Sequence, residues 1–200
     1  FNWLEGNSHI AMNLDIPPRM RYAGRFNEAL EISVKNFKYF HENQTGKTKF
    51  LNVLQGDDEN TYQHWYNSVK GFEFNGWGIG GGAGSLYRMM SAFKTLLQSK
   101  DHYNPNSLYW HILGTSKVID FFVLSQLQKS LNDINSPVQV TTDSSTPSRA
   151  VTYGLYYYGV DLRGPSYRSL HIPKERAENN KDVSNHTEST LQGSESLLPN

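Results

Sequence analysis

Cysteine is absent from the 200 residues of the chain. Without it the protein has no disulfide framework, no redox-active thiol and no cysteine-based zinc site. This composition suits a reducing compartment, and we expect a cytoplasmic protein. Long apolar runs are also lacking, because charged residues interrupt the apolar segments every few positions, and no signal peptide is evident. We therefore expect no membrane partner.

An excess of either charge is missing as well. The 19 Lys and Arg residues balance the 19 Asp and Glu residues. A dominant polybasic surface is thus excluded, and any contact with nucleic acid would come from local clusters such as Arg19, Arg21 and Arg25. The histidines show no spacing typical of metal ligands, so we expect no metal site.

Two glycine-containing patterns lack an essential member. Gly46-Lys47-Thr48 resembles the end of a phosphate-binding loop, but His41 stands where that loop needs a glycine. Gly76, Gly78 and Gly81 fit the spacing of a dinucleotide-binding turn, but no acidic residue follows at the required distance. We expect neither site, and no cofactor.

What the chain does contain is a repeated alternation of strand and helix patterns. Short apolar or β-branched runs predict buried strands at 9–15, 50–54, 76–80, 109–116 and 138–142. Helical spacing of apolar residues predicts helices over 20–40, 62–69, 86–97 and 117–131, the last capped by Ser116. This order predicts parallel βαβ units in an α/β protein, either a (β/α)8 barrel or a doubly wound sheet.

The pattern changes after the fifth strand. Aromatic residues at 153–158 predict a further strand, and 167–172 is expected to return as its hairpin partner. From 173 to 200 the residues are mostly polar, which predicts a disordered tail behind a folded domain at 1–172. The start at Phe1 rather than Met favours the later part of a longer polypeptide.

Asp143 is the residue with the clearest chemical interest. It follows the β-branched run Val138-Gln139-Val140-Thr141-Thr142 and begins a turn rich in Ser, Thr and Pro. This order places a carboxylate at the C-terminal tip of a strand, where α/β enzymes hold their catalytic groups. The alternative interpretation is that Asp143 only caps the turn or the next helix.

Five strand ends, read together, resemble the C-terminal part of the tRNA-guanine transglycosylase superfamily, whose members exchange bases on a (β/α)8 barrel. The resemblance covers about 10–154, and no single segment is specific. The segments that carry it are Met12-Asn13-Leu14-Asp15, Val53-Leu54-Gln55-Gly56, Gly76-Trp77-Gly78-Ile79-Gly80-Gly81, Ile112-Leu113-Gly114-Thr115, and Asp143-Ser144-Ser145-Thr146-Pro147-Ser148-Arg149. The resemblance implies a TIM barrel of which about the last five βα units are present.

The resemblance also implies site residues. Asp143 corresponds to the family's nucleophile, which forms a covalent intermediate with the nucleic acid while guanine leaves. Asp15 corresponds to the aspartate that binds the edge of the incoming base, and Gln55 with Gly56 to the amide that reads the base carbonyl. The other positions that it implies are Gly80 and Gly81 facing the heterocycle, Leu113 under the ring, and Arg149 toward nucleic acid.

Three departures distinguish this chain from the tRNA enzymes. The family's second aspartate lies on an earlier strand than any present here. The cysteines of the family's structural zinc site are absent, and Val151-Thr152-Tyr153 stands in the region where a second arginine is usual. These differences favour the phage and bacterial branch that inserts 7-deazaguanines into DNA.

The sequence therefore predicts a pentosyltransferase that replaces guanine in DNA with a 7-deazaguanine base. The alternatives are a tRNA-guanine transglycosylase of the queuine or archaeosine type, and a non-catalytic barrel subunit that binds nucleic acid or a catalytic partner. Five βα units leave an open barrel, so we expect either an oligomer or a missing N-terminal half to complete it.

Overall fold

The computed structural model describes residues 1–80, 85–161, 163–164 and 166–171. Its main body is a five-stranded, all-parallel sheet with the strands in sequential order. The strands are β1 (Ile10–Met12), β2 (Lys49–Leu54), β3 (Gly76–Ile79), β4 (Tyr109–Ile112) and β5 (Gln139–Thr142). Gly81 and the expected disordered tail at 173–200 lie outside the described residues.

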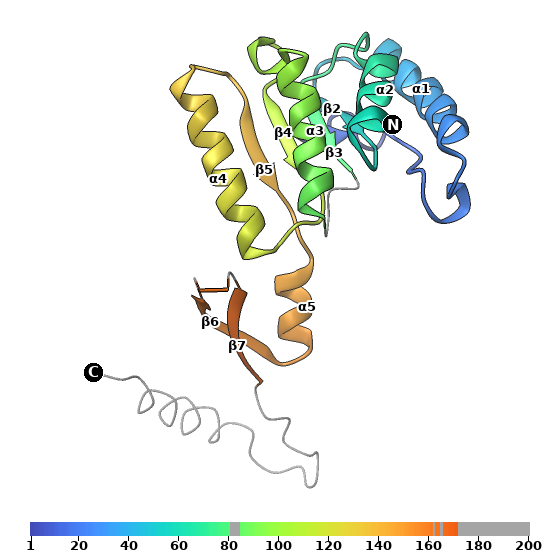
Figure 1. Ribbon diagram of the computed structural model, residues 1–200. Helices are drawn as coiled ribbons and strands as arrows, with labels where there is room; N and C mark the ends of the chain where they lie inside the picture. Colours follow the sequence, from blue (N-terminus) through green and yellow to red (C-terminus); the bar gives the residue numbers. More distant parts are fainter. Residues whose placement is uncertain (81–84, 162, 165, 172–200) are drawn as a thin grey trace, which may run out of the picture.

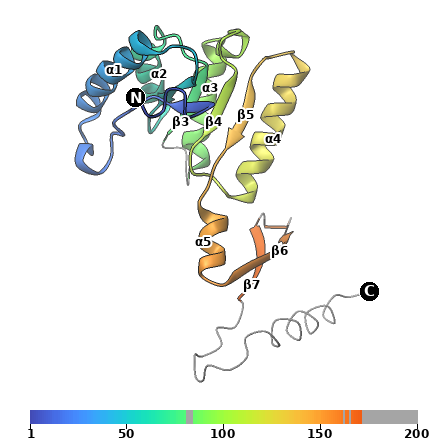
Figure 2. The same ribbon diagram turned by 180° about the vertical axis from the view of Figure 1, so that it is seen from behind.

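Four helices connect the strands, and they cover one face of the sheet. In Figure 1, α3 and α4 lie in front of the strands, and in the view from behind the strands come forward (Figure 2). The helices are α1 (Phe26–Asn43), α2 (Glu59–Val69), α3 (Leu86–Gln98) and α4 (Val118–Asp133), with short 3-10 turns at Met20–Tyr22 and Asp101–Tyr103. Sequential parallel strands with right-handed crossovers require this one-sided arrangement.

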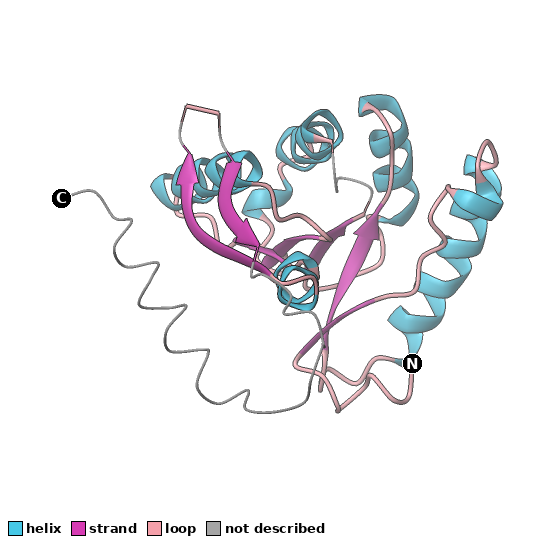
Figure 3. Cartoon of the chain, turned by 90° about the horizontal axis from the view of Figure 1, so that it is seen from below, coloured by secondary structure: helices cyan, strands magenta, loops and turns pink. Residues whose placement is uncertain are grey.

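The sheet curls like part of a TIM-like barrel, with the helices on its outer side (Figure 3). An α/β protein with a parallel sheet is therefore confirmed, with a five-stranded half-barrel as its architecture. Within the described residues β1 and β5 each pair on one side only. The sheet is thus open at both edges.

Alternation of side chains along the strands divides the sheet into two faces. Phe50, Trp77 and Trp110 point toward the helices, where their rings pack against Phe40, Tyr66 and Phe93. Burial of each large apolar side chain contributes about 1.5–3 kcal/mol. In each strand the residues that alternate with these point to the opposite face of the sheet. We call this opposite face, represented by Met12, Val53, Gly78, His111 and Thr141, the inner face.

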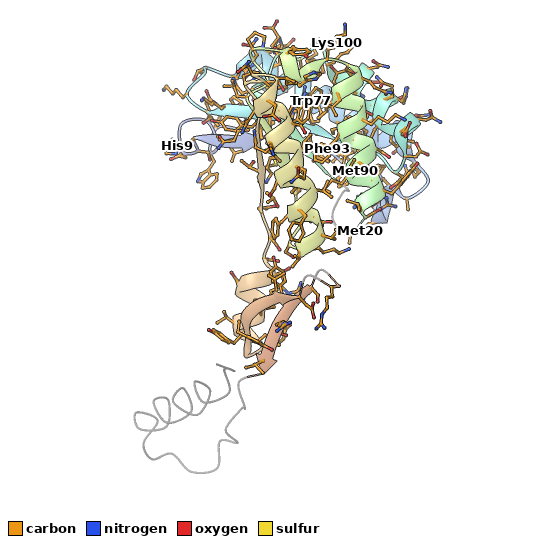
Figure 4. The ribbon with its side chains drawn as sticks, turned by 60° about the vertical axis from the view of Figure 1, so that its left-hand side comes forward. His9, Met20, Trp77, Met90, Phe93 and Lys100 are labelled. Atoms are coloured by element: carbon orange, nitrogen blue, oxygen red, sulfur yellow. The ribbon has the colours of Figure 1, made fainter. Side chains whose placement is uncertain are left out.

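Helix α2 buries the aromatic face that its sequence predicts, and it begins three residues before the predicted range. Asp58 and Thr61 form a capping box, in which the Asp58 carboxylate accepts from the Thr61 amide at 2.8 Å. Trp65 is fully buried and donates its indole N–H to the Val53 carbonyl at 2.9 Å. Helix α3 is more exposed than expected: Phe93 is buried, but Met90, one turn earlier, is 47% exposed. Figure 4 labels both residues on this helix.

Several predicted boundaries are wrong. Helix α1 begins at Phe26 rather than at 20, because Gly24 adopts a left-handed conformation with φ of +74° that a helix cannot include. Strand β1 is three residues long and partly exposed, since it is an edge strand, and β5 is likewise only half-buried. Ser116 does not cap α4; Lys117 takes the N-cap position, and the Asp120 side chain in the first turn binds the Thr115 hydroxyl instead.

The glycine patterns occur in the wrong structural context for nucleotide binding. Gly46-Lys47-Thr48 lies between the end of α1 and the start of β2, whereas a phosphate loop leads from a strand into a helix. Gly76 and Gly78 lie inside β3 rather than in the turn that follows it. At Gly78 an added Cβ would meet Met12 Sδ at 3.3 Å, so this glycine admits close packing on the inner face.

Beyond β5 the chain leaves the sheet at its C-terminal edge. The short helix α5 (Thr146–Thr152) leads into an antiparallel hairpin of β6 (Leu155–Asp161) and β7 (Ser166–His171), which confirms the predicted hairpin. The hairpin lies below the C-terminal ends of the strands in Figure 1, and β7 contacts α4. Within the part of the chain that the structure describes, no helix combines the length and apolar character needed to traverse a bilayer.

Candidate active site

The predicted site residues follow the C-terminal ends of the five strands. Asp15 comes shortly after β1, Gln55 and Gly80 directly after β2 and β3, and Leu113 and Asp143 directly after β4 and β5. Because all five strands are parallel, these residues lie at the same end of the sheet, where the strands terminate. The structure divides them into two groups, one around Gln55 and one around Asp143.

The first group joins Asp15, Gln55 and Gly80. The Gln55 Nε2 atom donates a hydrogen bond of 2.8 Å to Asp15 Oδ2. Gly80 lies directly against the same amide, since a Cβ built on it would be 2.1 Å from Gln55 Nε2. Burial raises the pKa of Asp15 above its usual value, although the hydrogen bond from Gln55 acts in the opposite direction. The group is therefore a close-packed, partly desolvated acid–amide pair.

One atom of this group lacks a partner. Gln55 is 5% exposed, and its Oε1 atom is buried with no hydrogen-bond partner within the described residues. A buried acceptor left unpaired costs about 1–3 kcal/mol. An N–H donor from a ligand would remove that cost, so the geometry suits a ligand that presents a donor edge.

Tyr62 closes the outer side of the first group. Its hydroxyl donates to the Gly80 carbonyl at 3.1 Å, and burial raises its pKa far above the usual value, so it remains a neutral donor. A Cβ on Gly56 would lie 2.6 Å from Tyr62 Cγ and 2.8 Å from its backbone nitrogen. The observed reason for a glycine at Gly56 is thus the packing of α2.

The second group centres on Asp143. Its Oδ1 atom accepts a hydrogen bond of 2.6 Å from the Gly114 amide, which fixes the carboxylate to the β4–α4 connection. The side chain is 59% exposed, so the carboxylate still opens to a ligand. A turn-capping role alone, the alternative interpretation from the sequence, would direct this carboxylate at its own turn. Instead it binds the backbone of the neighbouring strand's loop.

His111 belongs to this group and was missed in the sequence analysis. Its Nε2 atom lies 3.6 Å from Asp143 Oδ1, which is too long for a hydrogen bond but close enough for an electrostatic contact. Its Nδ1 atom lies 2.8 Å from the Thr141 hydroxyl. Burial lowers the pKa of His111 below its usual value, while the Asp143 charge acts to raise it. The sequence did contain a signal for His111. It lies two positions before Leu113 in the predicted strand, so the period of two places both side chains on the same face of the sheet.

The two groups sit toward opposite edges of the sheet. Asp15 follows β1 and Asp143 follows β5, four strand spacings apart, or about 19 Å along the sheet before its curvature is counted. Gly80 and Leu113 lie between them, and the Leu113 amide binds the Ile79 carbonyl at 3.2 Å. The carboxylates of Asp15 and Asp143 therefore lie at the same end of the strands but near opposite sides of the sheet, and they do not contact each other.

Arg149 lies outside both groups, exposed on α5. Over residues 1–80 and 85–171, leaving out 162 and 165, no three His, Asp or Glu side chains are grouped closely enough to hold a metal ion.

No protein-family model matches the chain, and a comparison with curated proteins finds no significant match.

Proposed function

We propose that the protein is a base-exchange glycosyltransferase that replaces guanine in DNA with a 7-deazaguanine base. The observation that carries the proposal is the position of two groups at the C-terminal ends of the strands of the half-barrel. There an exposed carboxylate, Asp143, and a buried amide with an unpaired acceptor, Gln55, both follow parallel strands. The first can form a bond to a sugar, and the second can read a flat heterocycle.

In this proposal Asp143 is the nucleophile. Its carboxylate attacks C1′ of the target deoxyribose, forming an ester bond as the bond from C1′ to guanine breaks. Guanine leaves with the bonding electron pair and takes up a proton. The incoming base then loses its N–H proton, attacks C1′ and releases Asp143, so two inversions retain the configuration. Since Gly114 holds Oδ1, Oδ2 is the oxygen that we assign to the attack.

The first group supplies recognition of the base. Gln55 Oε1 accepts from an N–H of the heterocycle, and the Asp15 carboxylate accepts from a second donor on the same edge. The bare backbone at Gly80 lets the Gln55 amide lie directly against it, which holds the amide in position to read the base. In this proposal Leu113, which is half-buried and directly follows β4, contacts the ring.

His111 supports the nucleophile. The His111 Nδ1 atom lies 2.8 Å from the Thr141 hydroxyl and its Nε2 atom faces Asp143 Oδ1, and we assign the ring proton to Nε2, with the hydroxyl donating to Nδ1. A neutral imidazole there stabilises the carboxylate through its N–H dipole without forming a tight ion pair. The Oδ2 atom of Asp143 is left available to attack.

Labelled base exchange tests the proposal. Purified protein is incubated with DNA carrying tritiated guanine and an unlabelled 7-deazaguanine base, and release of label is measured. Asp143→Ala should lower release by about 10³-fold or more and abolish a covalent protein–DNA adduct on denaturing gels. Asp133→Ala, which removes an exposed carboxylate at the end of α4, is the matched control. Exchange or adduct formation that survives in Asp143→Ala would exclude the proposal.

The same assay with tRNA in place of DNA separates the DNA reaction from the tRNA alternative. A non-catalytic role is the second candidate. The outer sides of β1 and β5 favour it, because they are unpaired within the part of the chain that the structure describes and exposed sheet edges are sites for partner strands. It predicts no label release from either nucleic acid by the wild-type chain, together with binding to a second polypeptide.

A further inference from the structure

Asp143 also lines a concave site of its own. It is a pocket of about 260 Å³ between the end of β5, the start of α4 and the β6–β7 hairpin. Aromatic rings of Phe121, Tyr157 and Tyr167 form part of its wall, and hydroxyl side chains form most of the rest. Among its described lining residues Asp143 is the charged one. This composition suits a flat neutral group better than a phosphate.

The two tyrosines belong to one face of the hairpin. Their ring centroids are 5.1 Å apart with an interplanar angle of 46°. Tyr157 is half-buried, whereas its neighbours Tyr156 and Tyr158 on the opposite face are 58% and 52% exposed. The strand period of two thus directs one pair of rings toward the pocket and leaves the others in solvent. Burial and the nearby Tyr157 also raise the pKa of Tyr167, which keeps its hydroxyl neutral.

Hydroxyl groups provide polar contacts at the rim. Ser116 and Ser144 each donate to the Thr146 hydroxyl at 3.0 Å, and Thr142 donates to the Thr115 carbonyl at 3.1 Å. A hydroxyl both donates and accepts, so this rim can bond to either kind of group on a heterocycle. A ring system with polar edges therefore fits both parts of the lining.

We propose that this pocket holds the nucleobase adjacent to the exchanged guanine in the same strand, stacked on Tyr157, Tyr167 and Phe121. The inference rests on the proposed function, which places the target sugar at Asp143. Because Asp143 lines both sites, the neighbouring nucleotide lies within reach of the pocket. Stacking on aromatic rings is tolerant of base identity, so the site selects an unpaired, flipped-out neighbour rather than a particular sequence.

Affinity for single-stranded oligonucleotides tests the pocket. Kd is measured by fluorescence anisotropy for the full chain with an oligonucleotide containing one guanine, and with versions abasic at each flanking position. Loss of one stacked base should weaken binding about 5- to 150-fold. Tyr157→Leu and Tyr167→Leu should weaken binding of the intact strand by a similar factor, and should add nothing when the critical flanking base is absent.

The hairpin offers its own controls. Tyr156→Leu and Tyr158→Leu, on the opposite face, should leave Kd within about twofold, since they lose no stacked base. Tyr157→Phe keeps the ring and should retain affinity, which separates stacking from misfolding. As a second measurement, 2-aminopurine at the critical flanking position should be quenched in the wild-type complex and not in Tyr157→Leu.

Two results would exclude the stacking pocket without excluding the proposed function. One is wild-type affinity of Tyr157→Leu for the intact strand, and the other is an equal loss in Tyr156→Leu. If the wild-type chain exchanges guanine while either result is found, only the stacking pocket is excluded. If the wild-type chain neither binds an oligonucleotide nor exchanges guanine, both the pocket and the proposed function are excluded.

Discussion

The imidazole of His111 lies 3.6 Å from the carboxylate of Asp143, on adjacent parallel strands, with the Thr141 hydroxyl on its other nitrogen. The three side chains form a row across the inner face at the end of the sheet. Their sequence separations of 30 and 32 residues show that strand register, rather than local sequence, creates the row.

His111 predicts an acidic limb in the pH profile of base exchange. Burial lowers its pKa, so the ring is neutral at pH 7 and becomes charged only below the usual value of 6.5. Protonation would pair the ring tightly with Asp143 and weaken the nucleophile, so kcat should fall as pH decreases through the lowered pKa. In His111→Gln this limb should disappear, and kcat at pH 7 should fall about tenfold while KM changes little.

The lowered pKa of His111 also makes the free energy of unfolding depend on pH. Below pH 6.5 the unfolded chain binds a proton at His111 that the folded chain resists, so stability rises with pH between the lowered pKa and 6.5. His64→Gln, at an exposed position on α2, is the control. A His111→Gln profile that keeps the wild-type acidic limb would contradict the assignment.

Gly80→Ala should impair base recognition without unfolding the protein. The added methyl would meet the end of the flexible Gln55 side chain at 2.1 Å, so Gln55 can turn away, and the hydrogen bond to Asp15 would break. Loss of one buried polar contact to the base should raise KM for the incoming base about tenfold or more. Gly71→Ala, with nothing within 4 Å of its Cβ, should leave KM and thermal stability unchanged. Equal KM values for the two variants would contradict the assigned role of Gln55.

Asp15→Asn should stabilise the fold at neutral pH. Burial raises the pKa of Asp15, so the folded chain holds its proton more tightly than the unfolded chain does. Stability therefore declines as pH rises from about 3.8 through the raised pKa, and an amide avoids that loss. Chemical denaturation at pH 7 and pH 3 should show a gain for Asp15→Asn only at pH 7.

Asp58 is a control carboxylate for Asp15, because its pKa is shifted in the opposite direction. Hydrogen bonds from Thr61 lower its pKa, so its contribution is present above pH 3.8 and is lost as pH falls through the lowered pKa. Asp58→Ala should cost about 1 kcal/mol at pH 7 as the loss of a helix cap. If Asp15→Asn were destabilising at pH 7 as Asp58→Ala is, the inferred desolvation of Asp15 would be wrong.

The elements of the fold are largely predictable from local sequence. Helix α2 illustrates this, because its buried residues Tyr62, Trp65, Tyr66 and Val69 follow from helical spacing alone. The less accurate elements are those whose environment is set elsewhere. Strand β1 lacks a neighbour on one side, and α1 begins after the positive φ of Gly24, neither of which is visible in hydrophobic periodicity.

The sequence by itself determined the absence of any cysteine-based site, the order of strands and helices, and the positions of Asp15, Gln55 and Asp143 next to strand ends. Only the tertiary structure decided which of them meet. Gln55 reaches Asp15, while Asp143 meets His111 and Gly114 instead, and Tyr157 and Tyr167 face the same pocket as Asp143. The physical reason is register: contacts between residues 30 to 40 positions apart depend on how strands align and how the sheet curls, which local periodicity does not encode.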